Sequence, residues 1–158
     1  MKKSSVLFVA GVVCAFACAS LYAADRGTPA EAQALIKKAV EHFKSVGRKQ
    51  ALEDFTGKKS PWVDRDLYVA CIDANHMIVA NGAFPSYVGM KGDVLKDANG
   101  VPVSTAAWDG VKKSATGEAA IEYPWFNPVT GKMEQKVTYF QKVADDVICG
   151  VGVYKAAK

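Results

Sequence analysis

Apolar and polar residues alternate most clearly in the last third of the chain. Within residues 119–154, three runs of strand-forming residues are separated by two turn signals. In the first turn Pro128 fixes its own φ angle and Gly131 can adopt a positive one, so the chain can reverse direction there. A shorter break follows at residues 144–146. The pattern predicts three consecutive antiparallel strands.

The alternation gives these strands an aromatic face. Ile121, Tyr123 and Trp125 occupy every second position of the first strand. In the second strand Val137 and Tyr139 share a face, and we expect hairpin pairing to bring them close to Tyr123 and Trp125. Such a face must be covered by another part of the chain.

A helical period precedes all the strands. Thr28, Pro29 and Glu31 form a capping box with proline in the first helical position, and apolar residues then recur every three or four positions. Gly47 ends this helix. A second, shorter helix is predicted over residues 48–55. Both helices must pack against a sheet that forms later in the chain.

Two more strands are predicted in the middle of the chain. Leu67–Asp73 is a continuous apolar run, which indicates a strand covered on both faces and central in its sheet. A turn then leads to a second strand at residues 77–80. The signals up to residue 116 are mixed and include a helix at about residues 104–113. Trp62, in the polar connector before the first strand, is expected to pack on the core.

The order of these elements predicts an α+β fold. Two helices are followed by two strands, a mixed loop and helix, and three strands. We expect a five-stranded antiparallel sheet, with the long N-terminal helix on one face and the insertion after the second strand on the other.

The beginning of the chain has the anatomy of a secretory signal peptide. A pair of lysines precedes an apolar run at residues 6–16, and small residues follow, with cleavage expected after Ala23. The prediction is a signal peptide at residues 1–23 and one exported domain, periplasmic or secreted, at residues 24–158. Two alternatives stay open. One is a lipoprotein signal that leaves Cys18 at the N-terminus, and the other is a retained anchor, although a spanning helix needs about 20 apolar residues.

Charge argues against a nucleic-acid partner. Cleavage removes two lysines, which lowers the formal net charge from +4 to about +2. No basic stripe with interleaved aromatic residues is present. We therefore expect no nucleic acid among the partners.

Cysteine usage limits the chemistry. Cys71 and Cys149 remain after cleavage, both inside predicted strands. In an oxidising compartment neighbouring thiols form a disulfide, whereas separated ones serve as small apolar residues, and both outcomes are open. The absence of a Cys-x-x-Cys motif argues against thioredoxin-like redox chemistry, a zinc knuckle and covalent haem.

Two other motifs are incomplete. Residues 97–100 resemble the start of a calcium-binding loop, but the full twelve-residue pattern with its terminal glutamate is missing. Residues 150–152 are too short for a dinucleotide-binding fingerprint. No metal and no cofactor are predicted.

Five short motifs resemble the single Cache domain family. They follow one another in the family's order, and the match as a whole spans about residues 30–155, which is nearly all of the exported domain. The motifs are residues 66–74 (DLYVACIDA), Val88-Gly89, residues 96–100 (KDANG), residues 123–132 (YPWFNPVTGK) and residues 150–154 (GVGVY).

The resemblance implies a fold and a function class. It implies a PAS-like sheet in which the first strand lies beside the last, with a small-molecule pocket under the segment inserted after the second strand. It also implies extracytoplasmic sensing of small ligands such as short carboxylates or amino acids. If the first and last strands are neighbours, Cys71 and Cys149 can face each other, depending on register. Similar sequences tend to have a histidine where this chain has Asn81, which keeps a hydrogen-bonding group but loses a cationic one.

Three aromatic residues are candidates for holding a ligand. Pockets of this kind are mostly apolar with a few orienting polar groups. Tyr123, Trp125 and Tyr139 combine apolar bodies with polar tips and lie on one face by the alternation above. Plain core packing is the alternative for each of them.

Three further residues are candidates for contacting the ligand. Lys136 resembles the lysine that similar Cache sequences place ahead of the tyrosine, and it suits an anionic ligand. Strict alternation puts it on the face opposite Tyr139, which favours a solvated surface lysine instead. Asn81 lies at the mouth of the insertion, where a turn residue is the alternative. Tyr68 is a candidate by its place on the central strand.

Two function classes remain. The first is an exported binding module that captures a small metabolite and signals through a membrane-bound partner. The second is a small exported α+β enzyme of the isomerase or dehydratase kind, and a structural subunit is also open. Catalysis needs an acid or base with a shifted pKa inside the pocket. His42 is predicted on the first helix and His76 in a turn, and both are expected at the surface. No catalytic residue is therefore predicted, which favours binding.

Overall fold

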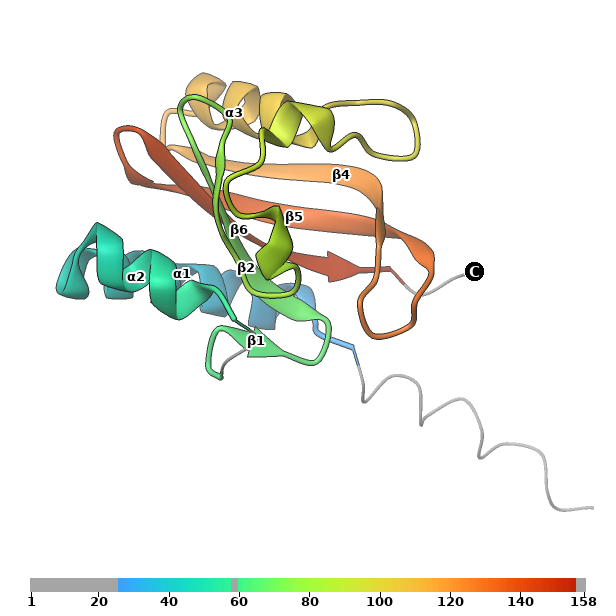
Figure 1. The fold of residues 1–158 in the computed structure, drawn as a ribbon, viewed down its shortest axis with the longest axis horizontal. Coiled ribbons are helices and arrows are strands. Elements are labelled where there is room, and N and C mark those ends of the chain that lie inside the picture. Colours follow the sequence, from blue (N-terminus) through green and yellow to red (C-terminus); the bar gives the residue numbers. More distant parts are fainter. Residues whose placement is uncertain (1–25, 58–59, 156–158) are drawn as a thin grey trace, which may run out of the picture.

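Antiparallel strands form one sheet at the centre of the protein, and helices cover both of its faces (Figure 1). The computed structural model describes residues 26–57 and 60–155, and six strands lie within these ranges. The main path through the sheet is β1-β2-β6-β5-β4, and β3 also pairs with β2. The strands are β1 (Val63–Asp64), β2 (Leu67–Asp73), β3 (Ile78–Asn81), β4 (Glu118–Phe126), β5 (Met133–Ala144) and β6 (Val147–Tyr154).

Two helices, α1 (Pro29–Val46) and α2 (Arg48–Phe55), cover one face of the sheet. The capping box at the start of α1 is formed. The Glu31 backbone N–H donates to the Thr28 hydroxyl at 3.3 Å, and the Thr28 backbone N–H donates to the Glu31 carboxylate at 2.7 Å. These bonds satisfy backbone donors that the helix itself leaves free. The observed bounds of both helices agree with those predicted from the sequence.

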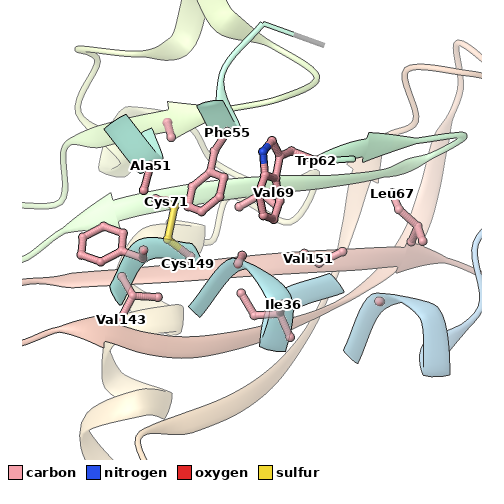
Figure 2. Close-up of a cluster of buried hydrophobic side chains, with 14 of the residues drawn as sticks. Ile36, Ala51, Phe55, Trp62, Leu67, Val69, Cys71, Val143, Cys149 and Val151 are labelled. Carbon is pink, nitrogen blue, oxygen red and sulfur yellow. A yellow bond between two sulfur atoms is a disulfide. The ribbon is translucent and has the colours of Figure 1, made fainter. Parts of the chain in front are cut away.

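The larger hydrophobic core lies between these helices and the sheet (Figure 2). Phe55 and Trp62 meet in it edge to face, with ring centroids 4.7 Å apart, so the predicted packing of Trp62 on the core is confirmed. β2 and β6 pair so that Cys71 lies opposite Cys149, and a disulfide joins them. The structure thus contains the bridged arrangement, buried under the two helices.

The opposite face of the sheet is covered by the insertion between β3 and β4. It contains two short 3-10 helices, η1 (Pro85–Tyr87) and η2 (Gly92–Val94), and the helix α3 (Val103–Lys113). Trp108 of α3 packs against Phe140 and Ile148 of the sheet, and its ring N–H donates to the carbonyl oxygen of Asp73 at 2.7 Å. The rest of the insertion lies over the β2 side of this face (Figure 1).

The predicted fold class and order of elements are confirmed, with one addition. β1 is only two residues long, too short to show a periodic pattern, and it was not among the five expected strands. Residues 1–25, which contain the predicted signal peptide, lie outside the described residues. Among the described helices, none combines the length and apolar character needed to span a membrane.

Candidate ligand-binding site

Three polar side chains lie in one row on the face of the sheet that the insertion covers. Tyr123 on β4 is paired with Lys136 on β5, which is paired in turn with Tyr154 on β6. Residues opposite one another on paired strands project to the same side of the sheet. Tyr68 of β2 completes the group because its hydroxyl reaches the lysine.

The amino group of Lys136 is enclosed by phenols. The side chain is only 3% exposed, and its Nζ donates to the hydroxyl oxygens of Tyr68 at 2.7 Å and Tyr154 at 3.2 Å. It also lies 3.9 Å and 4.5 Å from the centroids of these two rings, within the range of a cation–π contact. Burial disfavours the charged form and lowers the pKa of Lys136 to about 7.

Glycine residues of β6 make room for these side chains. A Cβ atom at Gly152 would lie 2.1 Å from Cε of Lys136, and one at Gly150 would lie 2.6 Å from the Phe140 ring. Neither distance is compatible with van der Waals contact. The Gly-Val-Gly sequence therefore lets two large side chains of β5 lie flat across β6.

The phenols of the cluster remain protonated at neutral pH. Burial raises the pKa of Tyr68 and of Tyr154 and brings the pKa of Tyr123 to about 12. For Tyr68, hydrogen bonds from Tyr154 and Trp125 act in the opposite direction without reversing the shift. The hydroxyl of Tyr154 donates to the carbonyl oxygen of Phe126 at 2.7 Å. The phenols are thus uncharged, and those of Tyr154 and Tyr123 are hydrogen-bonded within the protein, to Phe126 and Thr138.

A pocket of about 60 Å³ lies between this face and the insertion. Its walls come from β2, β3, β4, the two 3-10 helices and the start of α3. They include Ala70, Ile72, Ile78, Asn81, Tyr87, Leu95, Ser104 and Trp125. Trp125 connects the pocket to the polar cluster, since its ring lies edge to face with Tyr123 at 5.7 Å and its side chain packs against the cluster that contains Tyr68 and Tyr154.

Residues 87–95 cover the pocket and are called its roof. Asp93 of η2 connects this segment to neighbouring parts of the protein. This carboxylate accepts hydrogen bonds from the hydroxyls of Ser104 at 2.5 Å and Thr105 at 2.8 Å, and it lies 3.3 Å from the ring of His76. Hydrogen bonds from the two hydroxyls hold the pKa of Asp93 below its usual value. The backbone N–H of Gly92 also donates to the His76 carbonyl at 2.6 Å. The roof is therefore joined both to α3 and to the turn between β2 and β3.

The site offers oxygen and nitrogen groups but no metal ligands of the usual kind. Within the described residues, no cluster of His, Cys, Asp and Glu side chains could hold a metal ion. The arrangement instead combines a small, mostly apolar pocket with a basic group and phenol hydroxyls beside it, which suits a small polar ligand.

A comparison with protein families matches residues 17–156 to the family described as Single Cache domain 2. The match covers most of the chain. The protein belongs to the single Cache domain family. Cache domains of this kind are sensor domains that bind small ligands. A search of curated protein sequences found no relative of this chain.

Solved structures share the fold of this Cache domain. A methyl-accepting chemotaxis protein from Vibrio parahaemolyticus is 22% identical in sequence and superposes with a TM-score of 0.65. The alignment covers 79% of this chain and 86% of the chemotaxis protein chain. A periplasmic sensor domain of a chemotaxis protein is 21% identical, with coverage of 87% and 100% and a TM-score of 0.66. A Cache chemosensory domain, described for its carboxylic acid recognition, is 20% identical, with coverage of 89% and 100% and a TM-score of 0.65.

Five of the six predicted ligand residues of the Cache domain lie together. Tyr68, Tyr123 and Lys136 belong to the polar cluster, and Trp125 and Asn81 line the pocket. Asn81 also acts as a turn residue, because its side-chain oxygen accepts hydrogen bonds from the backbone N–H groups of residues 83 and 84. Whether any of them contacts a ligand stays a prediction.

The predicted face of Tyr139 is wrong. Tyr139 lies opposite Ala120 and packs against the core under α1, together with Val137. It therefore points away from Tyr123 and Trp125. The alternation along β5 was correctly identified, but its two sets of residues were assigned to the wrong sides of the sheet. Lys136 was accordingly expected in solvent, and it is buried because the glycines of β6 open space for it.

Two tyrosines of the site were missed from the sequence. Tyr154 contributes a hydroxyl and a ring to the cluster, and Tyr87 lines the pocket. A signal for Tyr154 existed. It follows Gly152 by two positions, so it shares the face on which that glycine permits close packing. Tyr87 lies in the insertion, where no periodic pattern indicates direction.

Proposed function

We propose that this Cache domain binds a small anionic or zwitterionic metabolite, such as a short carboxylate or an amino acid, in the pocket under the insertion. The observation that carries the proposal is the buried amino group of Lys136, which has only phenols as hydrogen-bond partners. In this proposal a carboxylate binds beside Trp125, which packs against Tyr123 and against the cluster that contains Tyr68. Hydrogen bonds between charged groups are stronger than those between neutral ones.

The size of the pocket supports a ligand of few atoms. Sites for drug-sized molecules have volumes of roughly 300–1,000 Å³, whereas this one measures about 60 Å³. Its apolar walls, such as Ile72, Ile78 and Leu95, suit a short hydrocarbon tail. The carboxylic acid recognition named for one structural neighbour is consistent with this ligand class.

We further propose an extracytoplasmic place and a signalling role. In this proposal residues 1–23 are a cleaved signal peptide, and residues 24–158 form the exported domain. The neighbours include a periplasmic sensor domain of a chemotaxis protein, which supports this location. Binding would be reported to a membrane-bound signalling partner.

A thermal-shift screen of the exported chain tests the ligand class. We expect short organic acids or amino acids to stabilise it, by roughly 2.7 kcal/mol when the ligand is present at a hundred times its Kd. Trp125→Ala and Lys136→Met should lose this stabilisation, while Tyr139→Phe, on the opposite face, should keep it. A folded Trp125→Ala variant that responds like the wild type would show that the ligand binds elsewhere.

The same samples separate binding from catalysis. A binding module returns its ligand unchanged after long incubation, whereas an isomerase or dehydratase converts it. Proton NMR of the recovered ligand distinguishes the two outcomes. If none of the organic acids or amino acids stabilises the chain, the binding proposal fails.

A further inference from the structure

The residues that lie near Lys136 on three other strands are tyrosines, which are uncharged. Tyr68 comes from β2, Tyr154 from β6 and Tyr123 from β4. Within the described part of the chain, no carboxylate forms an ion pair with this lysine. The acidic group that acts on it electrostatically is Asp66, just before β2, and its influence on the pKa of Lys136 is weaker than that of burial.

Asp66 is itself engaged with the start of α1. One of its carboxylate oxygens accepts a hydrogen bond from the backbone N–H of Gly27 at 2.6 Å, and the other has no hydrogen-bond partner among the described residues. Asp66 is fully buried. It therefore does not supply Lys136 with a directly contacting counter-ion. The amine must be charged without an adjacent anion or give up its proton.

A ligand carboxylate changes this balance. An opposite charge within about 4–6 Å favours the protonated form of an amine. Two residues that line the pocket, Ala70 and Trp125, pack against Tyr68 and Tyr154, so an anion in the pocket would lie near the phenols that hold the amino group. The protonation state of Lys136 in the empty site then differs from that in the occupied one.

We propose that anion binding in this pocket is coupled to the uptake of one proton by Lys136, so that the site takes up an anion and a proton together. This inference rests on the proposed function. The balance is simple: the neutral amine Nζ forms one N–H bond with a proton from solvent, and the ligand anion compensates the resulting charge. The phenols remain protonated throughout.

The coupling sets the direction of the pH dependence. With the pKa of Lys136 at about 7 in the empty site, the amine is already charged at pH 6, and binding needs no further proton. Above pH 7 binding must draw a proton from solvent, so the affinity falls as the pH rises, by up to about tenfold per pH unit. The decline ends when the pH reaches the higher pKa of the occupied site. A short carboxylic acid stays ionised over this range, since its own pKa is about 4 to 5.

Calorimetry with acetate as the probe tests the coupling. Titrations of the exported chain at pH 6 and pH 8, each in two buffers of different ionisation enthalpy, give the number of protons bound with the ligand. We expect about 0.1 proton at pH 6 and about 0.9 at pH 8, with a Kd about tenfold weaker at pH 8. In Lys136→Met, an unbranched side chain that lacks the amino group, both the proton uptake and the pH dependence should disappear. Tyr139→Phe should behave like the wild type.

A direct measurement keeps the test independent of that variant's folding. NMR of the chain labelled with ¹³C-lysine follows the Cε resonance of Lys136 without and with saturating acetate. We expect its titration near pH 7 in the empty site and about three pH units higher, near the ordinary value for lysine, in the occupied one. Acetate binding at pH 8 without proton uptake overturns the coupling and leaves the proposed function standing. Absence of acetate binding at pH 6 also overturns the coupling, and the proposed function falls with it only if the wider ligand screen fails as well.

Discussion

The side chain of Lys136 lies across Gly152 of the neighbouring strand, with Cε of the lysine in the space where a side chain at position 152 would begin. We therefore predict that Gly152→Ala displaces Lys136. Overpacking of a core typically costs about 1–3 kcal/mol, and we expect a loss of this size in the free energy of unfolding, measured with urea. The lysine that no longer fits should move toward solvent, which returns its pKa toward the ordinary value.

Gly150→Ala is the matched control for this substitution. A Cβ atom there meets the Phe140 ring rather than Lys136. Both variants should lose stability, but only Gly152→Ala should shift the NMR titration of Lys136. If Gly152→Ala leaves that titration near pH 7, the glycine does not position the lysine.

The disulfide joins Cys71 of β2 to Cys149 of β6, two residues that are 78 positions apart in the sequence. A bridge that closes a long loop restricts the unfolded chain and stabilises the folded one. We predict that the double substitution of both cysteines by alanine lowers the free energy of unfolding by about 2–5 kcal/mol, the usual cost of losing a native bridge. Urea unfolding monitored by circular dichroism measures this.

Thiol counting supplies the control. The exported chain unfolded without reductant should expose no free thiol, and with reductant it should expose two. Reduced wild type and the double variant should then have similar stabilities. A free-thiol count of two in the chain unfolded without reductant would show that the bridge does not form in solution.

Local signals explain which parts of the fold were predictable. The capping box of Thr28 and Glu31 and the glycine after residue 46 act within a few residues, so α1 was predicted at its observed bounds. The uninterrupted apolar run of β2 likewise indicated burial on both faces. β1 is too short to carry a period, and it exists because Val63 pairs with Tyr68 across a tight turn.

The orientation of β5 depends on residues far away in the sequence. Alternation separates Lys136 and Phe140 from Val137 and Tyr139, but it does not say which set faces the helices. The choice follows from β6, where two glycines leave room for long side chains on one side only. The aromatic residues of β4 were therefore assigned to a common face correctly, whereas the two sides of β5 were exchanged. The register that brings Cys71 opposite Cys149 is equally a property of the assembled sheet.

The buried amine makes the stability of the empty domain depend on pH. Folding lowers the pKa of Lys136 from its ordinary value of 10.5 to about 7. Between these values the unfolded chain binds more protons than the folded one, so the free energy of unfolding rises with pH, by at most about 1.4 kcal/mol per pH unit. We predict that the wild type gains about 2 kcal/mol between pH 7 and pH 9 relative to Lys136→Met.

Urea unfolding of both proteins at the two pH values measures the difference. At pH 7 the methionine variant should be at least as stable as the wild type, because it removes a buried charge without leaving a partner charge behind. A wild type whose stability relative to Lys136→Met stays constant from pH 7 to pH 9 would mean that the lysine keeps its ordinary pKa in the folded protein.

The roof of the pocket gives the last prediction. Asp93 receives hydrogen bonds from Ser104 and Thr105 and lies beside His76. These contacts join η2 to α3 and to the turn between β2 and β3. Asp93→Asn keeps the size of the side chain but removes its charge, and hydrogen bonds to charged groups are the stronger ones. We expect faster amide hydrogen exchange in residues 87–95, because this segment opens locally more often. Ligand dissociation should also be faster.

Asp109→Asn, on the exposed side of α3, removes the same charge at a position that does not line the pocket. Hydrogen exchange followed by mass spectrometry should show no change in residues 87–95 for this control. Global stability should remain within about 1 kcal/mol of the wild type in both variants, since the broken contacts lie in one partly exposed segment. Equal exchange rates in Asp93→Asn and Asp109→Asn would mean that packing alone holds the roof in place, and that the Asp93 carboxylate does not control access to the pocket.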